Sequence, residues 1–330
     1  MCVERAVSAL YLEDSDKVAQ VEFLAHTDFI AKVSGLDPLK RPEEALSKTY
    51  ERLDLDMVWF TYDPLHPWNL AERRGDRFVA RADSWSRAFP STWRETFSVK
   101  SIDEVLEFDP FEVWKIPSLD ELTEHFQEVH RRVQNVYKSQ LVPGGTYLTC
   151  FMWLVMMFGL RWAVKAAYYG PRRFKKLLDR FGELSLLQAK AWARTDIKAF
   201  ISHDDICGTQ GPFFPPSWMR RYLFPWYRRL WSELRAKGIV VLFCTDGDMT
   251  RIVDDVAEAG ADGFIIEECC DQGYDDSVQG NPRIGELVAQ AAASEGLNTS
   301  EWLRNLVIAE LKRRNLLPLK REEKNKNLGV

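Results

Sequence analysis

The sequence predicts an α/β protein built on a parallel sheet. Between residues 197 and 267, short apolar strands alternate with amphipathic helices, and that alternation is typical of βαβ units. The 330-residue chain is 46% hydrophobic and 28% charged, as in ordinary folded globular proteins. Its length fits two domains of roughly 150 residues, or one α/β barrel of roughly 250 residues with an appendage. Length alone does not decide between these two domain organisations.

The amino-terminal half contains fewer regular patterns. Short helical segments broken by Gly and Pro lead to a predicted strand over residues 56–62, which is rich in β-branched and aromatic residues. Residues 67–118 hold many Trp and Pro and no long periodic stretch, so we expect loops packed over a scaffold. An acidic helix is predicted over 118–139, followed by an apolar strand around 145–152 and by further helices.

The carboxyl-terminal half is more regular. Its long helix repeats Met, Leu and aromatic residues at helical spacing, with Arg residues on the other faces, so one face packs on a sheet. The predicted elements are strand Ile197–Ser202, helix Pro216–Ala236, strand Ile239–Phe243, helix Asp248–Ala259 and strand Gly263–Glu267.

Charge and cysteine content exclude several classes of protein. The net charge is −5 and the pI is about 5.7, so the chain lacks the basic field of a nucleic-acid-binding protein. Six scattered cysteines without a preceding signal segment indicate reduced thiols in a cytoplasm. The most apolar run, residues 148–160, is shorter than the roughly 20 residues of a membrane helix. We expect a cytoplasmic protein with a buried core there.

Polar clusters follow three successive predicted strands, at residues 201–207, 243–248 and 266–271. Because the carboxyl ends of parallel strands face the ligand, we expect one convergent site, with Asp204, Cys244, Asp246 and Glu267 in a single pocket. The candidate catalytic residues are Asp204, Asp205, Asp246, Asp248 and Glu267. The candidate substrate contacts are Tyr62, His203 and Trp153.

Structural explanations compete with these roles. Asp248 precedes a predicted helix, and we favour an N-cap for it, worth roughly 1 kcal/mol. His203 equally fits a hydrogen-bonded core histidine. Cys269 and Cys270 fit the common fate of free cysteines, which is burial as small apolar residues.

Cys244 and Asp246 lie two residues apart at a strand end. In an extended segment they project to one side, where a thiolate and a carboxylate can share a metal ion. Two ligands do not make a site. The adjacent carboxylates Asp204 and Asp205 repel each other, so burial of either requires a partner.

Several segments together resemble the uroporphyrinogen decarboxylase superfamily, most closely its decarboxylase-like and cobalamin-dependent methyltransferase branch. The resemblance spans about residues 15–270, most specifically from Asp204 to Glu267. It implies a TIM-type (β/α)8 barrel with its active site at the strand ends described above. The matching segments are 203–216, 222–225, 237–238, 244–248 and 258–263.

Departures from the family pattern refine what the resemblance implies. Zinc methyltransferases of the superfamily carry His-x-Cys-Gly where this chain has Cys244-Thr-Asp-Gly247, so zinc on Cys244 and Asp246 is left open. The Arg-rich amino-terminal signature of the true decarboxylases is absent, and only the pairs Arg73-Arg74 and Arg172-Arg173 offer cations. The implied function is a methyltransferase or O-demethylase that moves a methyl group between a small substrate, with aromatic compounds among the candidates, and a corrinoid protein. The alternative is a decarboxylase of uroporphyrinogen or a related acid.

The carboxyl end departs further, since residues 281–330 predict two helices where the family would supply its last strands. We therefore expect a barrel over 1–280, incomplete at its last strands, and a helical tail over 281–330. The tail weakly resembles the helix pair of ribbon-helix-helix proteins without their basic strand. A third interpretation is a non-catalytic barrel remnant whose tail dimerises or contacts DNA. Packing of the tail on the barrel is favoured, a homo-oligomer comes next and DNA last.

Overall fold

The computed structural model describes residues 2–24, 26–65, 99–208 and 210–265, together with the backbone of 80–82 and 92–94. All of them lie in the unit Met1–Cys270. The predictions that concern Glu267, Cys269, Cys270, the final barrel strands and the tail over 281–330 fall outside the described residues.

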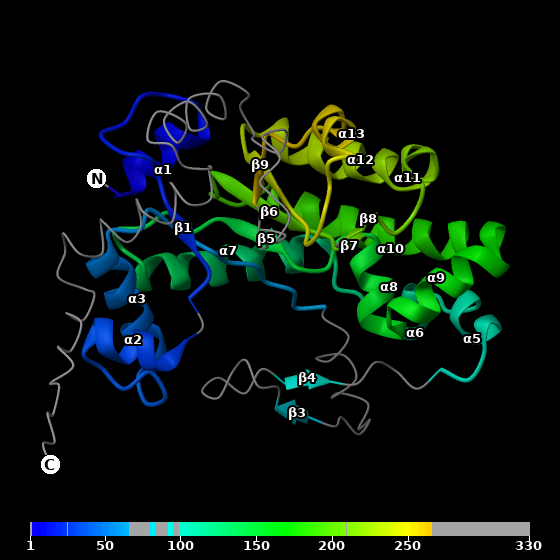
Figure 1. Cartoon of the computed structure of the whole chain (residues 1–330), viewed down its shortest axis with the longest axis horizontal. Coiled ribbons are helices and arrows are strands. Elements are labelled where there is room, and N and C mark those ends of the chain that lie inside the picture. Colours follow the sequence, from blue (N-terminus) through cyan, green and yellow to red (C-terminus); the bar gives the residue numbers. More distant parts are fainter. Residues whose placement is uncertain are drawn as a thin grey trace, which may run out of the picture. The chain divides into compact units, whose positions relative to one another are not determined.

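Parallel strands follow one another in chain order across the sheet (Figure 1). Four of them pair in the order β10-β9-β6-β5, and β1 pairs in parallel with β2. An isolated parallel bridge between Met57 and Leu141 connects β2 to the segment that enters β5. The strands are β1 (Val21–Glu22), β2 (Met57–Val58), β5 (Gly144–Thr146), β6 (Ala199–His203), β9 (Val240–Cys244) and β10 (Gly263–Ile265).

A barrel keeps its strands in chain order, as these are, whereas a doubly wound sheet reverses its strand order at a switch point. The predicted parallel α/β architecture is confirmed, while closure of the barrel stays a prediction. Two short antiparallel pairs lie outside the parallel series. They are β3 (Ala80–Ala82) with β4 (Thr92–Arg94), and β7 (Cys207–Gly208) with β8 (Gly211–Pro212).

Helices connect the parallel strands and cover their outer side. The helix α7 packs on α10, and α10 packs on α12; Phe126 of α7 stacks on Trp192 of α10 with ring centroids 4.3 Å apart. The helices are α1 (Cys2–Leu10), α2 (Thr27–Ser34), α3 (Pro42–Leu53), α5 (Ile102–Leu106), α6 (Pro110–Val113), α7 (Leu119–Val136), α8 (Phe151–Phe158), α9 (Leu160–Tyr169), α10 (Pro171–Trp192), α11 (Pro216–Tyr222), α12 (Phe224–Arg235) and α13 (Val253–Ala259).

Alternation along β2 decides which side chains face inward. Val58 packs with Tyr50 and Val133 of the surrounding helices. Met57 packs instead with Leu141, with Ala6 of α1 and with Leu242 of β9. Because successive side chains of a strand point to opposite faces, odd-numbered residues of the segment after β2 point inward and even-numbered residues point toward the helices.

The sequence predicts α7 well. Ser118 and Glu121 form a reciprocal capping box at its start, and its buried residues repeat at helical spacing. The predicted helix over 216–236 is instead two helices that meet at Leu223. Pro225 lacks an N–H and its ring clashes with the carbonyl four residues earlier, so a continuous helix is interrupted there.

Three other predictions are wrong in part. The strand expected over 145–152 ends at Thr146, and residues from Phe151 form α8. The helix expected from Asp248 begins at Val253, with Ile252 as a cap that makes no side-chain bond. In the segment expected to be loops, α5 and α6 form, each started by a side-chain cap, Ser101 and Asp109 respectively.

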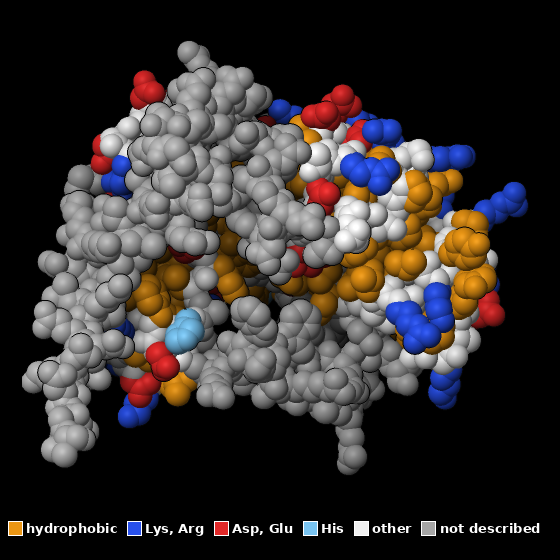
Figure 2. All heavy atoms as spheres, viewed as in Figure 1, with side chains coloured by type: hydrophobic (Ala, Val, Ile, Leu, Met, Phe, Trp, Pro, Cys, Tyr) orange, Lys and Arg blue, Asp and Glu red, His pale blue; other side chains and the backbone are white. Residues whose placement is uncertain are grey.

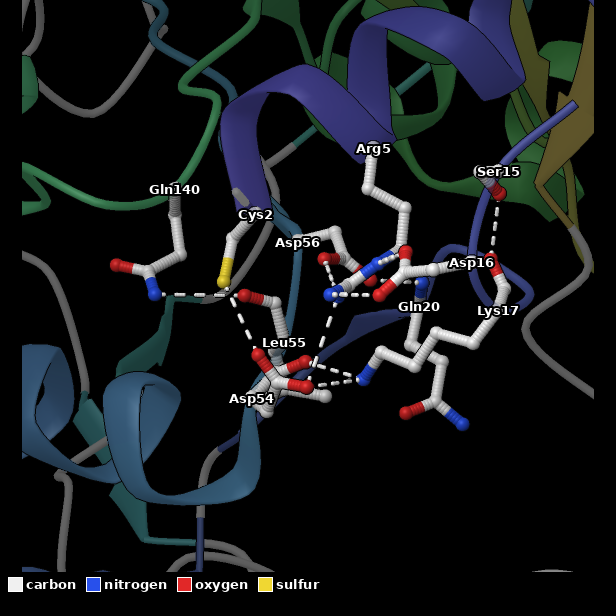
Figure 3. A network of polar contacts seen from close by, with 10 residues as sticks. All are labelled: Cys2, Arg5, Ser15, Asp16, Lys17, Gln20, Asp54, Leu55, Asp56 and Gln140. Atoms are coloured by element: carbon white, nitrogen blue, oxygen red, sulfur yellow. Dashed lines mark hydrogen bonds and ion pairs between the residues drawn. The ribbon is translucent and has the colours of Figure 1, made fainter. Parts of the chain in front are cut away.

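An ionic network centred on the buried Arg5 connects α1 to the beginnings of the strands (Figure 3). Arg5 pairs with the fully buried Asp56 and, at 2.7 Å, with Asp16. Lys17 pairs with Asp54 at 2.6 Å, and the Cys2 thiol donates to Asp54. Because β1 and β2 begin immediately after this network, it lies at the amino-terminal end of the strands, where residues serve stability rather than catalysis. In the described ranges, no helix has both the length and the apolar character needed to cross a membrane.

Candidate functional site

His203, the last residue of β6, stands at the centre of the polar cluster at the strand ends. Its Nδ1 lies 2.9 Å from the carbonyl oxygen of Tyr147. A carbonyl oxygen only accepts, so Nδ1 carries a proton and the ring orientation is set. The imidazole stacks on the Tyr147 ring at 3.9 Å between centroids. Its Nε2 lies 3.3 Å from Oδ1 of Asp205 and makes no hydrogen bond within the described part of the chain.

The contact between Tyr147 and His203 follows from strand register. Gly145 pairs with Ile201 and Thr146 pairs with Ser202 across β5 and β6, which places the next residues opposite each other. His203 in turn pairs with Cys244 on β9. Inward-facing residues of three neighbouring strands therefore meet at one level, at the carboxyl ends.

An aromatic row continues this level toward β1. The Trp59 ring lies edge-on to His203 at 6.5 Å, and Phe23 lies edge-on to Trp59 at 5.4 Å. Phe23 is 68% exposed, and Trp59 and Tyr147 are partly exposed. The indole Nε1 of Trp59 is buried without a hydrogen-bond partner in the described residues. Solvent therefore reaches one end of the row.

Carboxylates flank this row. Asp63 accepts hydrogen bonds from the backbone N–H groups of Tyr147, at 2.7 Å, and of Leu148, at 3.1 Å. Burial raises the pKa of the Asp63 carboxyl to about 6, although the two N–H groups and His203 act to lower it. Oδ1 of Asp205 accepts a hydrogen bond from the backbone N–H of Asp246 at 3.1 Å, so these two predicted residues lie together.

The side chain of Asp204 points away from His203, toward the start of α8. Its fully buried carboxylate accepts hydrogen bonds from the N–H groups of Phe151 and Met152, at 3.1 and 2.5 Å, and from the Tyr227 hydroxyl at 2.7 Å. Burial raises the pKa of this carboxyl well above its usual value. Asp204 thus satisfies the first N–H groups of α8, a tertiary contact that explains why the apolar run at 151–158 is a helix rather than a strand.

Two of the predicted substrate contacts lie away from His203. Tyr62 is on the even-numbered, outward side, and its hydroxyl lies 2.8 Å from Nε2 of His125 on α7. Trp153 is fully buried, stacks on Phe181 and donates from Nε1 to Ser185. Their assignment as substrate contacts stays a prediction that this placement does not favour.

Asp248 forms a local turn rather than the predicted helix cap. Its Oδ1 accepts from the backbone N–H of Thr250 at 2.9 Å, and bonds to Thr250 lower the pKa of the carboxyl. Its own N–H donates to the carbonyl of Gly208. Asp248 therefore joins the loop after β9 to the β7–β8 hairpin.

The described residues do not fit a zinc site. Cys244 is buried and pairs with His203 across β9 and β6. However, no group of three or more His, Cys, Asp or Glu side chains among the described residues is arranged to hold a metal ion. A structural or catalytic zinc ion needs at least three protein ligands.

Sequence reasoning missed Phe23, Trp59, Asp63 and Tyr147. The signal for two of them was present, because Trp59 and Asp63 share the odd-numbered face of the predicted strand that begins near residue 56. Choosing the face required knowing which side carried the core. Tyr147 was inaccessible to such reasoning, because its partner His203 is 56 residues away.

Comparisons with known proteins agree on a fold. Residues 90–289 match the family model described as uroporphyrinogen decarboxylase (URO-D). Among solved structures, a methyltransferase from Methanosarcina mazei superposes with a TM-score of 0.50 and 16% identity, over 80% of this chain and 75% of that chain. At that identity the likeness concerns the fold alone. No curated protein sequence matches the chain.

Proposed function

This chain belongs to the uroporphyrinogen decarboxylase family, and from that premise we propose that it is an enzyme which transfers a methyl group from a small substrate to a corrinoid carried by a partner protein. One observation supports this most strongly. An oriented imidazole, that of His203, lies beside the carboxylate of Asp205 and a partly exposed aromatic row, at the carboxyl ends of the strands. Active sites of barrel enzymes occupy that face.

The proposed role of His203 is to supply a proton. When a methyl group leaves as an electrophile, the electron pair of its bond stays on the heteroatom, which then takes a proton. The corrinoid would supply the nucleophile for the methyl carbon. Hydrogen bonding of Nδ1 to the Tyr147 carbonyl aims Nε2, and Asp205 stabilises the protonated ring. Asp246 positions Asp205 through its backbone N–H.

The charges of the site favour this reaction over the alternative decarboxylation. Asp63 and Asp205 flank the row, and no described Lys or Arg forms an ion pair with either of them. A substrate with several carboxylates would be repelled unless cations faced it. Arg73 and Arg74 lie outside the described residues. Arg173 is already paired with Asp103 and Glu107.

The surface around α9 supports a protein partner. Because α8 follows the carboxyl end of β5, and α10 then runs back over about 33 Å toward β6, α9 lies on the side of the strand ends. Tyr168 and Tyr169 are 79% and 68% exposed, beside exposed Arg161 and Arg172. Figure 2 shows hydrophobic side chains gathered with Lys and Arg at the right of the view, where α9 and α11 lie. Tyr and Arg are enriched in protein interfaces.

The test uses free reduced cobalamin as a surrogate acceptor. The full chain is incubated anaerobically with cob(I)alamin and a panel of methyl ethers, methyl thioethers and methylated amines, and methylcobalamin is followed by absorbance. At least one donor should be converted by the wild-type protein and not by His203→Gln. Absence of conversion with every donor, together with release of carbon dioxide from uroporphyrinogen, would establish the decarboxylase alternative. Elemental analysis of the same protein tests the zinc prediction.

A further inference from the structure

We infer that Asp63 is a positioning residue for His203, and that it acts through the peptide group which joins Tyr147 to Leu148. The inference rests on the proposed function and deepens it, because it concerns the side chain that supplies the proton there. Three features carry it. They are the hydrogen bonds at both ends of this peptide group, the negative charge of Asp63, and a second carboxylate, that of Asp205, on the other side of the imidazole.

One peptide group lies between the carboxylate and the imidazole. Its N–H belongs to Leu148 and donates to Oδ1 of Asp63 at 3.1 Å. Its carbonyl oxygen belongs to Tyr147 and accepts from Nδ1 of His203, 2.9 Å away. Because the peptide group is a single planar unit, a change in the charge of Asp63 reaches the ring without movement of a side chain. The other oxygen of Asp63 accepts from the Tyr147 N–H at 2.7 Å, which holds the carboxylate in place.

The charge of Asp63 makes this contact stronger than an ordinary backbone contact. Hydrogen bonds to an ionised acceptor are roughly twice as strong as neutral ones, and successive bonds in a chain polarise one another. An N–H that donates to a carboxylate therefore leaves more negative charge on the carbonyl oxygen of the same peptide group, and that oxygen binds the Nδ1 proton more tightly. The pKa of the Asp63 carboxyl shows the coupling in the reverse direction, because burial raises it to about 6 and His203 is among the groups that act to lower it.

Asp205 lies on the opposite side of the same ring. Its Oδ1 is 3.3 Å from Nε2 of His203, and a carboxylate there attracts a proton to Nε2. The Tyr147 carbonyl holds a proton on Nδ1. A neutral imidazole has one proton for these two positions, so the two sides compete for it, and together they favour the doubly protonated ring that the proposed reaction requires. Without the charge of Asp63, the single proton should move from Nδ1 toward Nε2.

The experiment locates the ring protons by NMR in the full chain labelled with ¹⁵N-histidine. The chain has five histidines, and His203→Gln identifies the signals of His203. At pH 7.5 the ratio of Nδ1-protonated to Nε2-protonated neutral ring should fall about tenfold in Asp63→Asn, because a charged acceptor is replaced by a neutral one. In the matched control, Asp262→Asn, the replaced carboxylate accepts the backbone N–H of Val241 in β9 at 2.9 Å, and the ratio should not change. An unchanged ratio in Asp63→Asn overturns the inference.

A second measurement follows the peptide group itself in the wild-type protein. Labelling with carbonyl-¹³C tyrosine and ¹⁵N-leucine selects the peptide groups of the Tyr-Leu pairs at 11–12, 147–148 and 222–223, and Tyr147→Phe identifies the second. Its carbonyl and amide signals should shift as the pH passes about 6, where Asp63 ionises, and the other two pairs are internal controls. Because Tyr147, Asp205 and, at the paired position on β9, Cys244 also face His203, the same titration in Asp63→Asn separates their effects. Absence of the shift in wild type overturns the inference.

Methyl transfer gives a readout that depends on the proposed function. With any donor that the wild-type protein converts, Asp63→Asn should lower kcat about tenfold and leave KM within about twofold, because Asp63 acts on the ring and not on the substrate. The difference from wild type should shrink below about pH 6, where Asp63 is protonated. A raised KM with unchanged kcat would show direct contact with substrate and overturn the inference. If the proton ratio changes and no donor is converted, the inference stands and the proposed function fails; if donors are converted and the ratio is unchanged, the reverse holds.

Discussion

At the residue scale, the proposed role of the strand-end cluster depends on the two ring nitrogens of His203. His203 is held at Nδ1 by a backbone carbonyl and faces Asp205 with Nε2. A histidine fixed in this way differs from a core histidine, whose two nitrogens are both satisfied. His130 of α7 offers a contrast at Nε2, because this nitrogen lies 3.0 Å from the carbonyl oxygen of Val142.

We predict that Asp205→Asn reduces methyl transfer to cob(I)alamin by about 10²-fold, because the charge that stabilises the protonated ring is lost. The measurement is the initial rate of methylcobalamin formation with whichever donor the wild-type protein converts. The control, Asp196→Asn, changes an exposed carboxylate that bonds Gln127 at the opposite end of β6. Equal rates for Asp205→Asn and the control would remove Asp205 from the site.

The carboxyl of Asp63 predicts a pH dependence of stability. Its pKa is raised from 3.8 to about 6 in the folded protein, so between these values the native state binds more protons than the unfolded state. The free energy of unfolding therefore falls as pH rises through this range. Asn mimics the protonated acid, and Asp63→Asn should lose less stability than wild type between pH 4 and 6.5. Urea denaturation at pH 4 and at pH 6.5 measures the loss of unfolding free energy in each protein. An equal loss in wild type and in Asp63→Asn would contradict the prediction.

At the element scale, the loop after β9 and the β7–β8 hairpin approach each other closely at one glycine. Gly247 has φ of +78°, and a Cβ there would lie 2.6 Å from the carbonyl carbon and oxygen of Gly208. Gly238 has φ of +73° with nothing within 4 Å. The two positions therefore separate backbone strain from steric overlap.

Gly238→Ala should cost about 1–2 kcal/mol of unfolding free energy, the penalty of the left-handed conformation alone. Gly247→Ala should cost more, because the overlap with the Gly208 backbone forces the loop and the hairpin apart. Denaturant unfolding of both variants compares them directly. The hairpin and loop would be shown to move independently if the two costs were equal.

The network between α1 and the strand beginnings predicts a large stability effect. Arg5→Met leaves the fully buried Asp56 without its cation (Figure 3), and a buried charge stripped of its partner costs about 3–5 kcal/mol. Arg41→Met, which breaks an exposed pair with Glu44, should cost under about 1 kcal/mol. Adding Asp56→Asn to Arg5→Met should restore part of the loss. Similar costs for both single variants would argue against the network.

At the scale of the whole molecule, the ionic network lies at one end of the strands and the proposed site lies at the other. The ionic network of Arg5 lies where β1 and β2 begin, and His203 lies where β6 ends. That division is the one expected of a barrel enzyme. It also places α9, with its exposed tyrosines, on the side where a partner would have to bring an acceptor group.

This arrangement predicts that charge reversal on α9 affects a protein acceptor selectively. Among the described residues, Arg161 and Arg172 form no ion pair, and both are exposed. The double variant Arg161→Glu, Arg172→Glu should slow transfer to a protein-bound corrinoid about tenfold at low salt, with less effect at high salt. Transfer to free cob(I)alamin should be unchanged. Arg131→Glu on α7 is the control, and an equal loss with both acceptors would show that the patch acts on the site itself.

Much of the fold could be predicted from local patterns. The alternation of apolar strands and amphipathic helices after residue 197 identified β6, β9 and β10, and the Ser118 and Glu121 pair located the start of α7. These features depend on periodicity and capping within a few residues. The resemblance to the uroporphyrinogen decarboxylase superfamily is confirmed by the family match over residues 90–289.

What the sequence by itself determined is therefore the parallel α/β class, the family and the strand ends where polar side chains gather. Only the tertiary structure decided which of those side chains face one another. Asp204 and Asp205 are adjacent in the chain, yet one caps α8 and the other faces His203, because successive residues at a strand end point to opposite sides. Tyr62 turned outward and Trp59 inward for the same reason. Pairing across strands joins residues that are tens of positions apart, and no local pattern carries that information.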